Sequence, residues 1–311
     1  MLNIYIMIKR TLYFGNPAYL SLKLKQLVVR LPQTDGEERD EKDLTRTVPI
    51  EDLGVIILDH KQITVTQALL AELLDNNCAV ITCDSRQLPT GLFLPLAGNS
   101  VQNERFRLQL DASLPLKKQL WQQTIEAKIR NQAAMLRYTT GEDHKNMMKW
   151  ADSVKSGDTD NMEARAAVYY WKTVFPSNPY FVRDHEGGGA NALLNYGYAI
   201  LRAIVARALV ASGLLPTLGI HHHNRYNAYC LADDIMEPYR PYIDKVVYDI
   251  LEECPDAEIS TAVKIKLLNI PVVEVQIGGK RSPLMVAVSY TTSSLVKCFR
   301  GESRRLLYPD M

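Results

Sequence analysis

The stretch LKKQLWQQTIEAKIRNQAAMLRY, residues 116 to 138, marks the point at which the chain changes character. It is rich in strong helix formers. Its apolar residues return at roughly helical spacing, at Leu116, Leu120, Ile125, Ile129 and Leu136. Strand-like sequence largely disappears from here on, so this stretch predicts that a helical domain has begun.

The sequence after this stretch continues the helical pattern to the C-terminus. Further helices are expected at about 143–155, 160–174, 191–212, 228–252 and 283–299. The polar and Gly-rich segments SGDTD, FPSNP and RDHEGGG separate them as loops. Residues 100–311 are therefore predicted to form the larger, all-α domain.

The sequence before residue 100 is rich in β-forming residues. From Thr11 it predicts a strand, a turn at residues 15–17 and a second strand in which Leu20, Leu22 and Leu24 alternate with polar residues, as in a hairpin with one solvated face. This part of the chain also contains three more β-rich runs, a predicted helix near 65–76 and a charged run at 35–43 that is expected to be a solvated loop. The fold class is α+β, with a mainly antiparallel, β-sandwich-like domain in residues 1–99.

Composition limits the class of protein. The chain has 311 residues, 47% hydrophobic content and a formal net charge of +1, which excludes a generally basic nucleic-acid coat but allows a local basic face. Its five cysteines include no CxxC pair, which fits neither a disulfide framework nor a cysteine zinc cluster. No run of eighteen apolar residues predicts a membrane span. A reducing cytoplasm is the expected compartment.

The segment LGIHHHNRYNAYCLADDIMEPYRPYID, residues 218 to 244, combines three histidines with a group of acids. Asp234 and Glu237 share one helical face, opposite an apolar stripe suited to the core. Pro238 and Pro241 should bend the helix just past Glu237. These acids could face a functional groove or only water, and sequence spacing leaves both readings open.

The residue types in this segment favour a hard cation over zinc. At most one or two neighbouring histidines of a loop can reach one ion, and Cys230 has no common zinc spacing to them. One imidazole with several carboxylate oxygens suits Mg²⁺ or Mn²⁺. Such an ion can activate an attacking oxygen and stabilise the leaving oxygen of a phosphodiester.

Other charged residues have simpler interpretations. Asp160 and Glu163 have the spacing of a capping box, which predicts a structural role for Glu163. Lys117 and Lys128 share one helical face, as Arg202 and Arg207 roughly do on theirs. Each could hold phosphate, although a solvated face is the expected fate of any one of them.

Three segments in a fixed order resemble a known family. They are EARAAVYYWKTVF (163–175), LNYGYAILRAIVARALVASGLLPTLGIHH (194–222) and LADDIMEPYRPYID (231–244). Together they resemble the helical domain of the CRISPR-associated adaptation integrases, the first-numbered Cas proteins. NPAYLSLKLKQLVV, TVPIEDLGVIILD and LWQQTIEAKIRNQAAML extend the resemblance to nearly the whole chain, closest to the type II branch that accompanies a single large RNA-guided effector nuclease.

The resemblance implies a β domain that dimerises and an α domain that holds the active site. It further implies Mg²⁺ or Mn²⁺ bound by Glu163, His222 and Glu237, with Asp234 as a supporting ligand. His221 and His223 remain the alternatives to His222. The implied DNA-binding residues are Arg202, Arg207, Arg225 and Arg240.

The implied activity is CRISPR adaptation, in which the 3′ hydroxyl of a prespacer attacks a phosphodiester of the repeat array. With water as the nucleophile, the same site would be an endonuclease. The implied partners are double-stranded DNA, a second copy of the chain and the small second-numbered Cas protein in a heterohexamer, together with the effector nuclease and a further adaptation protein. A non-catalytic DNA-binding scaffold is the main alternative to this activity. A structural zinc protein is a further alternative.

Overall fold

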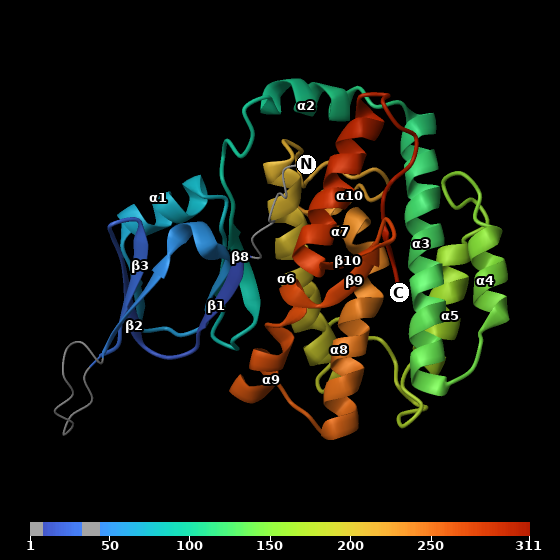
Figure 1. Cartoon of the computed structure of the whole chain (residues 1–311). Helices are drawn as coiled ribbons and strands as arrows, with labels where there is room; N and C mark the ends of the chain where they lie inside the picture. The colour runs from blue at the N-terminus through green and yellow to red at the C-terminus, as the bar shows by residue number, and fades with distance from the viewer. Residues whose placement is uncertain (1–8, 33–43) are drawn as a thin grey trace. The chain divides into compact units, whose positions relative to one another are not determined.

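The computed structural model describes residues 9–32 and 44–311 (Figure 1). The chain divides into two compact units, Met1–Gly98 and Asn99–Met311, a division one residue from the boundary expected between residues 99 and 100. The first unit is rich in strands and the second is mostly helical, which confirms the α+β fold class. The charged loop predicted at 35–43 lies outside the described residues.

The described residues of the first unit form two four-stranded sheets and a helix. One sheet has the order β1-β5-β7-β8, with β1 at Arg10–Phe14, β5 at Leu53–Leu58, β7 at Ala79–Cys83 and β8 at Pro89–Phe93. The other has the order β4-β3-β2-β6, with β2 at Ala18–Lys23, β3 at Gln26–Arg30, β4 at Thr45–Pro49 and β6 at Ile63–Val65. Both sheets and α1 (Gln67–Asp75) contribute to one core that includes Leu20, Leu27, Ile56, Leu69 and Val80.

The hairpin predicted across residues 15–17 is wrong. β1 pairs in parallel with β5, whereas β2 pairs with β3 around a turn at Leu24 and Lys25, both of which have positive φ. Residues 15–17 therefore connect two sheets. The β1–β5, β5–β7 and β2–β6 pairs are parallel, so the sheets are mixed and not mainly antiparallel. The alternation of leucines with polar residues indicated which face of β2 is solvated, but such a pattern does not tell which strand pairs with β2.

The second unit contains the six helices predicted from the sequence. They appear as α3 (Leu114–Thr140), α4 (Lys145–Asp152), α5 (Met162–Thr173), α6 (Ala190–Ala211), the bent pair α7 (Cys230–Met236) and α8 (Arg240–Glu253), and α10 (Leu284–Phe299). Two short helices, α2 (Gln102–Leu110) and α9 (Thr261–Leu267), were not predicted.

The prediction that this unit is all-α is wrong. A three-stranded sheet of order β10-β9-β11 lies within it, formed by β9 (Glu274–Ile277), β10 (Lys280–Pro283) and β11 (Pro309–Asp310). Gly278 and Gly279 both have positive φ and make the tight turn between β9 and β10. Strands of four residues or fewer are too short to show a periodic pattern in the sequence.

Helices α3 and α6 organise the unit. Ser113 caps α3 by accepting a hydrogen bond from the Leu116 N–H, Gly141 ends it in the left-handed conformation, and α3 packs against α4, α5 and α8. α6 packs against α7, α8 and α10 (Figure 1). By length and composition α6 could cross a membrane, but most of it is buried inside the unit, as expected of a core helix.

Gly197 allows the close approach of α6 and α8. A Cβ at this position would lie 2.5 Å from Cγ2 of Ile243. We expect Gly197→Ala to lower the free energy of unfolding by about 1–3 kcal/mol, because overpacking outweighs the helix propensity that alanine gains. Denaturant unfolding measures this. Gly188→Ala is the control, since an added Cβ there meets no described heavy atom within 4 Å; a Gly197→Ala protein as stable as the wild type would contradict the close approach.

Candidate active site

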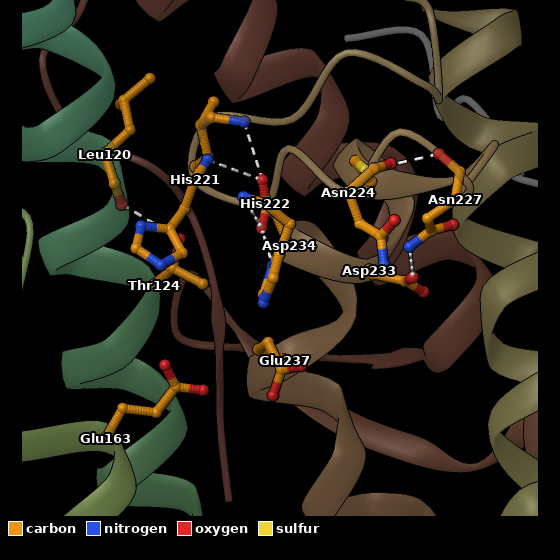
Figure 2. A network of polar contacts seen from close by, with 12 residues as sticks. Leu120, Thr124, Glu163, His221, His222, Asn224, Asn227, Asp233, Asp234 and Glu237 are labelled. Atoms are coloured by element: carbon orange, nitrogen blue, oxygen red, sulfur yellow. Dashed lines mark hydrogen bonds and ion pairs between the residues drawn. The ribbon is translucent and has the colours of Figure 1, made fainter. Parts of the chain in front are cut away.

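Three separate segments bring Glu163, His222 and Glu237 to one place. Glu163 lies in the first turn of α5, His222 in the loop between α6 and α7, and Glu237 in the 3₁₀ turn η2 (Glu237–Tyr239). Figure 2 shows their side chains turned toward a common space, with His222 above Glu237 and Glu163 facing both from the side of α3. The structure therefore brings the three predicted residues together.

Glu163 is not a helix-capping residue. The carboxylate of Asp158 accepts hydrogen bonds from the N–H groups of Met162 (2.9 Å) and Glu163 (3.0 Å), and Asp160 pairs with Lys155 instead. The predicted capping box is therefore wrong. Because Asp158 satisfies the first turn of α5, the Glu163 side chain is available to pair with Lys128, whose Nζ lies 2.7 Å from its Oε1.

Glu237 is a buried carboxylate held by two cations. Nε of Arg240 donates to its Oε1 at 2.8 Å, and Nζ of Lys128 lies 2.6 Å from its Oε2. Burial alone would raise the pKa of Glu237, but Arg240 and Lys128 outweigh burial and lower the pKa to about 2. α7 ends at Met236 and η2 follows, which confirms the bend predicted at Pro238.

Asp234 is fully buried and already saturated with donors. Its Oδ2 accepts from the N–H groups of Ile220 (2.7 Å) and His221 (2.9 Å), and its Oδ1 lies 2.5 Å from Nδ1 of His222. A Cβ on Gly219 would lie 2.8 Å from Oδ2 and 2.4 Å from the His222 carbonyl oxygen, so only glycine fits this turn. This geometry contradicts the role of supporting metal ligand and makes Asp234 the residue that orients His222.

Only His222 among the three histidines faces the acidic residues. Because Nδ1 faces the Asp234 carboxylate, the Nε2 lone pair is the one available to the site. The hydrogen bond to Asp234 raises the pKa of His222 above its ordinary value, against the effect of burial. His221 instead stacks on Trp121 with ring centroids 4.1 Å apart, and His223 is exposed.

Lys128 is the active-site residue that the sequence pattern missed. Its side chain was expected on a solvated face, yet it is buried and ends between Glu163 and Glu237. Burial lowers the pKa of Lys128, but Glu237 and Glu163 outweigh that effect and raise the pKa above the ordinary value. The ammonium is therefore charged.

The residues present fit a hard divalent cation. Two carboxylates and one imidazole face a common space, and the two carboxylates already hold a cationic group, the Lys128 ammonium. Nζ of Lys128 lies 2.6 Å from Oε2 of Glu237. In the arrangement that the structure shows, no three His, Cys, Asp or Glu side chains of residues 9–32 and 44–311 lie close enough together to bind one metal ion. At this site the Lys128 ammonium lies between the two carboxylates, where an ion would bind.

The acidic face of the bent helix is not solvated. Asp244 is buried and accepts hydrogen bonds from Tyr170 (2.6 Å) and Tyr198, and the Arg240 guanidinium lies over the Tyr198 ring at 4.6 Å. Burial raises the pKa of Asp244 from 3.8 to about 6 despite these hydrogen bonds. Arg240 links this network to Glu237, because its guanidinium lies over Tyr198 and its Nε pairs with the Glu237 carboxylate.

The four arginines predicted to bind DNA have different environments. Arg225 is exposed and lies over the Tyr226 ring, and half-buried Arg202 pairs with Asp233 at 2.6 Å. Arg207 is buried, which contradicts a contact with DNA, and Arg240 is already paired with Glu237. Arg202 and Arg225 remain predictions as DNA contacts.

We expect Asp234→Asn to lower the pKa of His222, because the variant loses the carboxylate that stabilises the imidazolium. NMR titration of the histidine ring protons measures this shift. Asp233→Asn is the matched control, since Asp233 pairs with Arg202 and Asn227. An unchanged His222 pKa in Asp234→Asn would contradict the orienting role of Asp234.

Asp244 makes stability depend on pH. Between pH 3.8 and about 6 the folded protein keeps a proton that the unfolded chain has lost, so the free energy of unfolding falls as pH rises through this window. The expected fall from this group is about 3 kcal/mol. Denaturant unfolding across the window should show a weaker dependence for Asp244→Asn. Parallel curves for the two proteins would rule out a raised pKa at Asp244.

Comparison with known proteins identifies a family that the chain resembles over most of its length. Residues 12–254 match the family described as "CRISPR associated protein Cas1". The "CRISPR-associated endonuclease Cas1" of Neisseria meningitidis serogroup C (strain 8013) is 38% identical over 288 residues, covering 92% of this chain and 90% of that protein.

Two solved structures share the fold. A "Casposase bound to integration product" superposes with a TM-score of 0.77 at 20% identity, covering 96% of this chain and 92% of that one. A chain of a "Cas6-RT-Cas1–Cas2 complex" superposes with a TM-score of 0.73 at 19% identity, covering 96% of this chain and 35% of that longer one. At these identities the similarity establishes the fold alone.

Proposed function

The chain belongs to the Cas1 family of CRISPR-associated proteins, and we propose that it is the metal-dependent DNA integrase and endonuclease of CRISPR adaptation. Its Neisseria relative is named an endonuclease, and the casposase of the same fold is bound to an integration product. The observation that carries the proposal is that the side chains of Glu163, His222 and Glu237, from three separate segments, face a common space in which the two carboxylates already hold a cation, Lys128.

The proposed reaction is a transesterification. The 3′ hydroxyl of a prespacer attacks a phosphodiester of the repeat array, a new phosphodiester replaces the old one, and no nucleotide triphosphate is needed. Mg²⁺ or Mn²⁺ held by Glu163, His222 and Glu237 would supply charge stabilisation for the oxygens that enter and leave phosphorus. Attack by water would give strand cleavage instead.

The residues around the three ligands prepare them for this role. Asp234 keeps Nδ1 of His222 occupied, so that Nε2 is presented to the site. Arg240 and Lys128 keep Glu237 ionised, as a ligand must be. Arg240 also lends positive charge to a site where the reacting group is an anion.

The proposed partners follow from the family. A chain of the same fold occurs in a complex with Cas2, which supports the small Cas2 protein as a partner, and another chain of this fold is described in a complex with DNA, which supports DNA. We further propose a homodimer through the β-rich unit, a heterohexamer with Cas2, and function in the cytoplasm within the type II branch, beside the effector nuclease and a further adaptation protein.

A non-catalytic DNA-binding scaffold is the alternative. It predicts DNA binding without metal-dependent cleavage or joining, and the intact set of two glutamates and a histidine argues against it. A structural zinc protein is disfavoured by Cys230, whose buried thiol donates to the carbonyl groups of Asn224 and Asn227 and has a raised pKa.

The test replaces the three proposed ligands one at a time. We expect Glu163→Ala, His222→Ala and Glu237→Ala each to reduce Mn²⁺-dependent strand transfer into a repeat-containing plasmid by about 100-fold or more, because each removes a ligand needed for transition-state charge. Glu237→Gln is the milder variant, since alanine removes the carboxylate that pairs with Arg240 and leaves Lys128 with Glu163 alone, whereas glutamine keeps an amide oxygen for them.

Glu258→Ala, an exposed carboxylate of the same unit, is the control and should retain strand transfer. DNA binding is measured in parallel. Undiminished strand transfer in all three ligand variants would reject the proposed function, and DNA binding without any joining by the wild type would favour the scaffold.

A further inference from the structure

The Lys128 ammonium lies between the carboxylates of two proposed ligands, Glu163 and Glu237. Its Nζ lies 2.7 Å from Oε1 of Glu163 and 2.6 Å from Oε2 of Glu237, so it bridges carboxylates from α5 and η2. The Lys128 side chain is 10% exposed and the Glu237 side chain 7% exposed. A buried bridge of this kind is far less screened by solvent than a surface ion pair.

The charges of this cluster balance as it stands. Glu163 and Glu237 contribute two negative charges, and Lys128 and Arg240 contribute two positive charges. A divalent ion added beside both cations would bring two further positive charges to these four residues, which a poorly solvated interior disfavours. Departure of one cation from the carboxylates relieves this excess and frees their oxygens for the ion.

The two cations differ in how firmly they are held. Both oxygens of Glu237 are in use, Oε1 by Arg240 and Oε2 by Lys128. The Arg240 guanidinium is also fixed by its position over the Tyr198 ring. Lysine carries a point charge on a flexible four-carbon stem, and the Lys128 ammonium is held by the two carboxylates alone, with no ring contact of the kind that Arg240 makes among the described residues. Lys128 is the cation that can leave.

We propose that Lys128 is a resident counter-cation that holds Glu163 and Glu237 together in the metal-free protein and must leave both carboxylates before a divalent ion can bind. This inference rests on the metal site of the proposed function. It makes Lys128 a competitor of the ion, so the intrinsic metal affinity of the three ligands exceeds the affinity that the wild-type protein displays.

The first test measures Mn²⁺ binding without DNA, by electron paramagnetic resonance titration of the whole chain at constant pH. We expect Lys128→Met to bind Mn²⁺ at least about tenfold more tightly than the wild type, because the competing charge is gone. Lys128→Arg, which keeps a cation, should not gain affinity. Lys117→Met, on the same helix and half-exposed, is the matched control for loss of a positive charge.

The second test uses the wild-type protein, because Lys128→Met leaves the buried carboxylate of Glu237 facing the half-buried one of Glu163 and can fail to fold. Limited acetylation with an amine-reactive reagent is quantified by mass spectrometry with and without saturating Mn²⁺. We expect modification of Lys128 to rise several-fold with Mn²⁺, while modification of Lys117 stays constant.

The outcomes separate this inference from the proposed function. Absence of Mn²⁺ binding by both the wild type and Lys128→Met would overturn the metal site itself, and this inference with it. Mn²⁺ binding by the wild type that is unchanged or weakened in Lys128→Met, or that leaves the acetylation of Lys128 unaltered, would overturn the counter-cation while leaving the metal site intact. If only Lys128→Met binds Mn²⁺, the result would support the proposal that Lys128 competes with the ion, because the competition would then prevent binding by the wild type altogether.

Discussion

A carboxylate is stable in a protein interior only when donors or cations surround it, and the helical unit buries several of them along one bent segment, among them Asp234, Glu237 and Asp244. Each of these three carboxylates has different partners. Asp234 accepts hydrogen bonds from backbone N–H groups and faces an imidazole, and Glu237 pairs with two cations. Asp244 accepts hydrogen bonds from two tyrosine hydroxyls. These partners come from α3, α5, α6 and the loop before α7, so satisfying the three acids ties the segments of the unit together.

The bend between α7 and α8 links this packing to chemistry. An unbroken helix would carry Glu237 with its neighbours on one regular face, whereas the 3₁₀ turn at Glu237–Tyr239 interrupts that register. The turn also packs against α3, the helix that carries Lys128. The residues that stabilise the core and the residues that form the site are therefore members of one charge network, and a change in either affects the other.

Local patterns in the sequence identified most helices and the bend. The apolar period of residues 116–138 predicted α3, and Pro238 predicted the interruption after Glu237. What failed depended on contacts between distant residues. The pairing of β1 with β5, the burial of Lys128 and the capping of α5 by Asp158 each require knowledge of what lies opposite in space. Spacing suggested a cap for Glu163, and only the family resemblance placed it with His222 and Glu237.

Trp121 gives the loop of three histidines an optical property. Its indole ring stacks on His221 and meets His222 edge-to-face at 5.5 Å, while its Nε1–H is buried and has no hydrogen-bond partner among the described residues. Indole emission responds to the distance and the charge of neighbouring imidazoles. The emission of Trp121, once Trp150 and Trp171 are replaced, therefore reports whether the histidine loop is packed against α3 and whether His222 is charged. The protein thus carries a spectroscopic probe of its own candidate site without any added label.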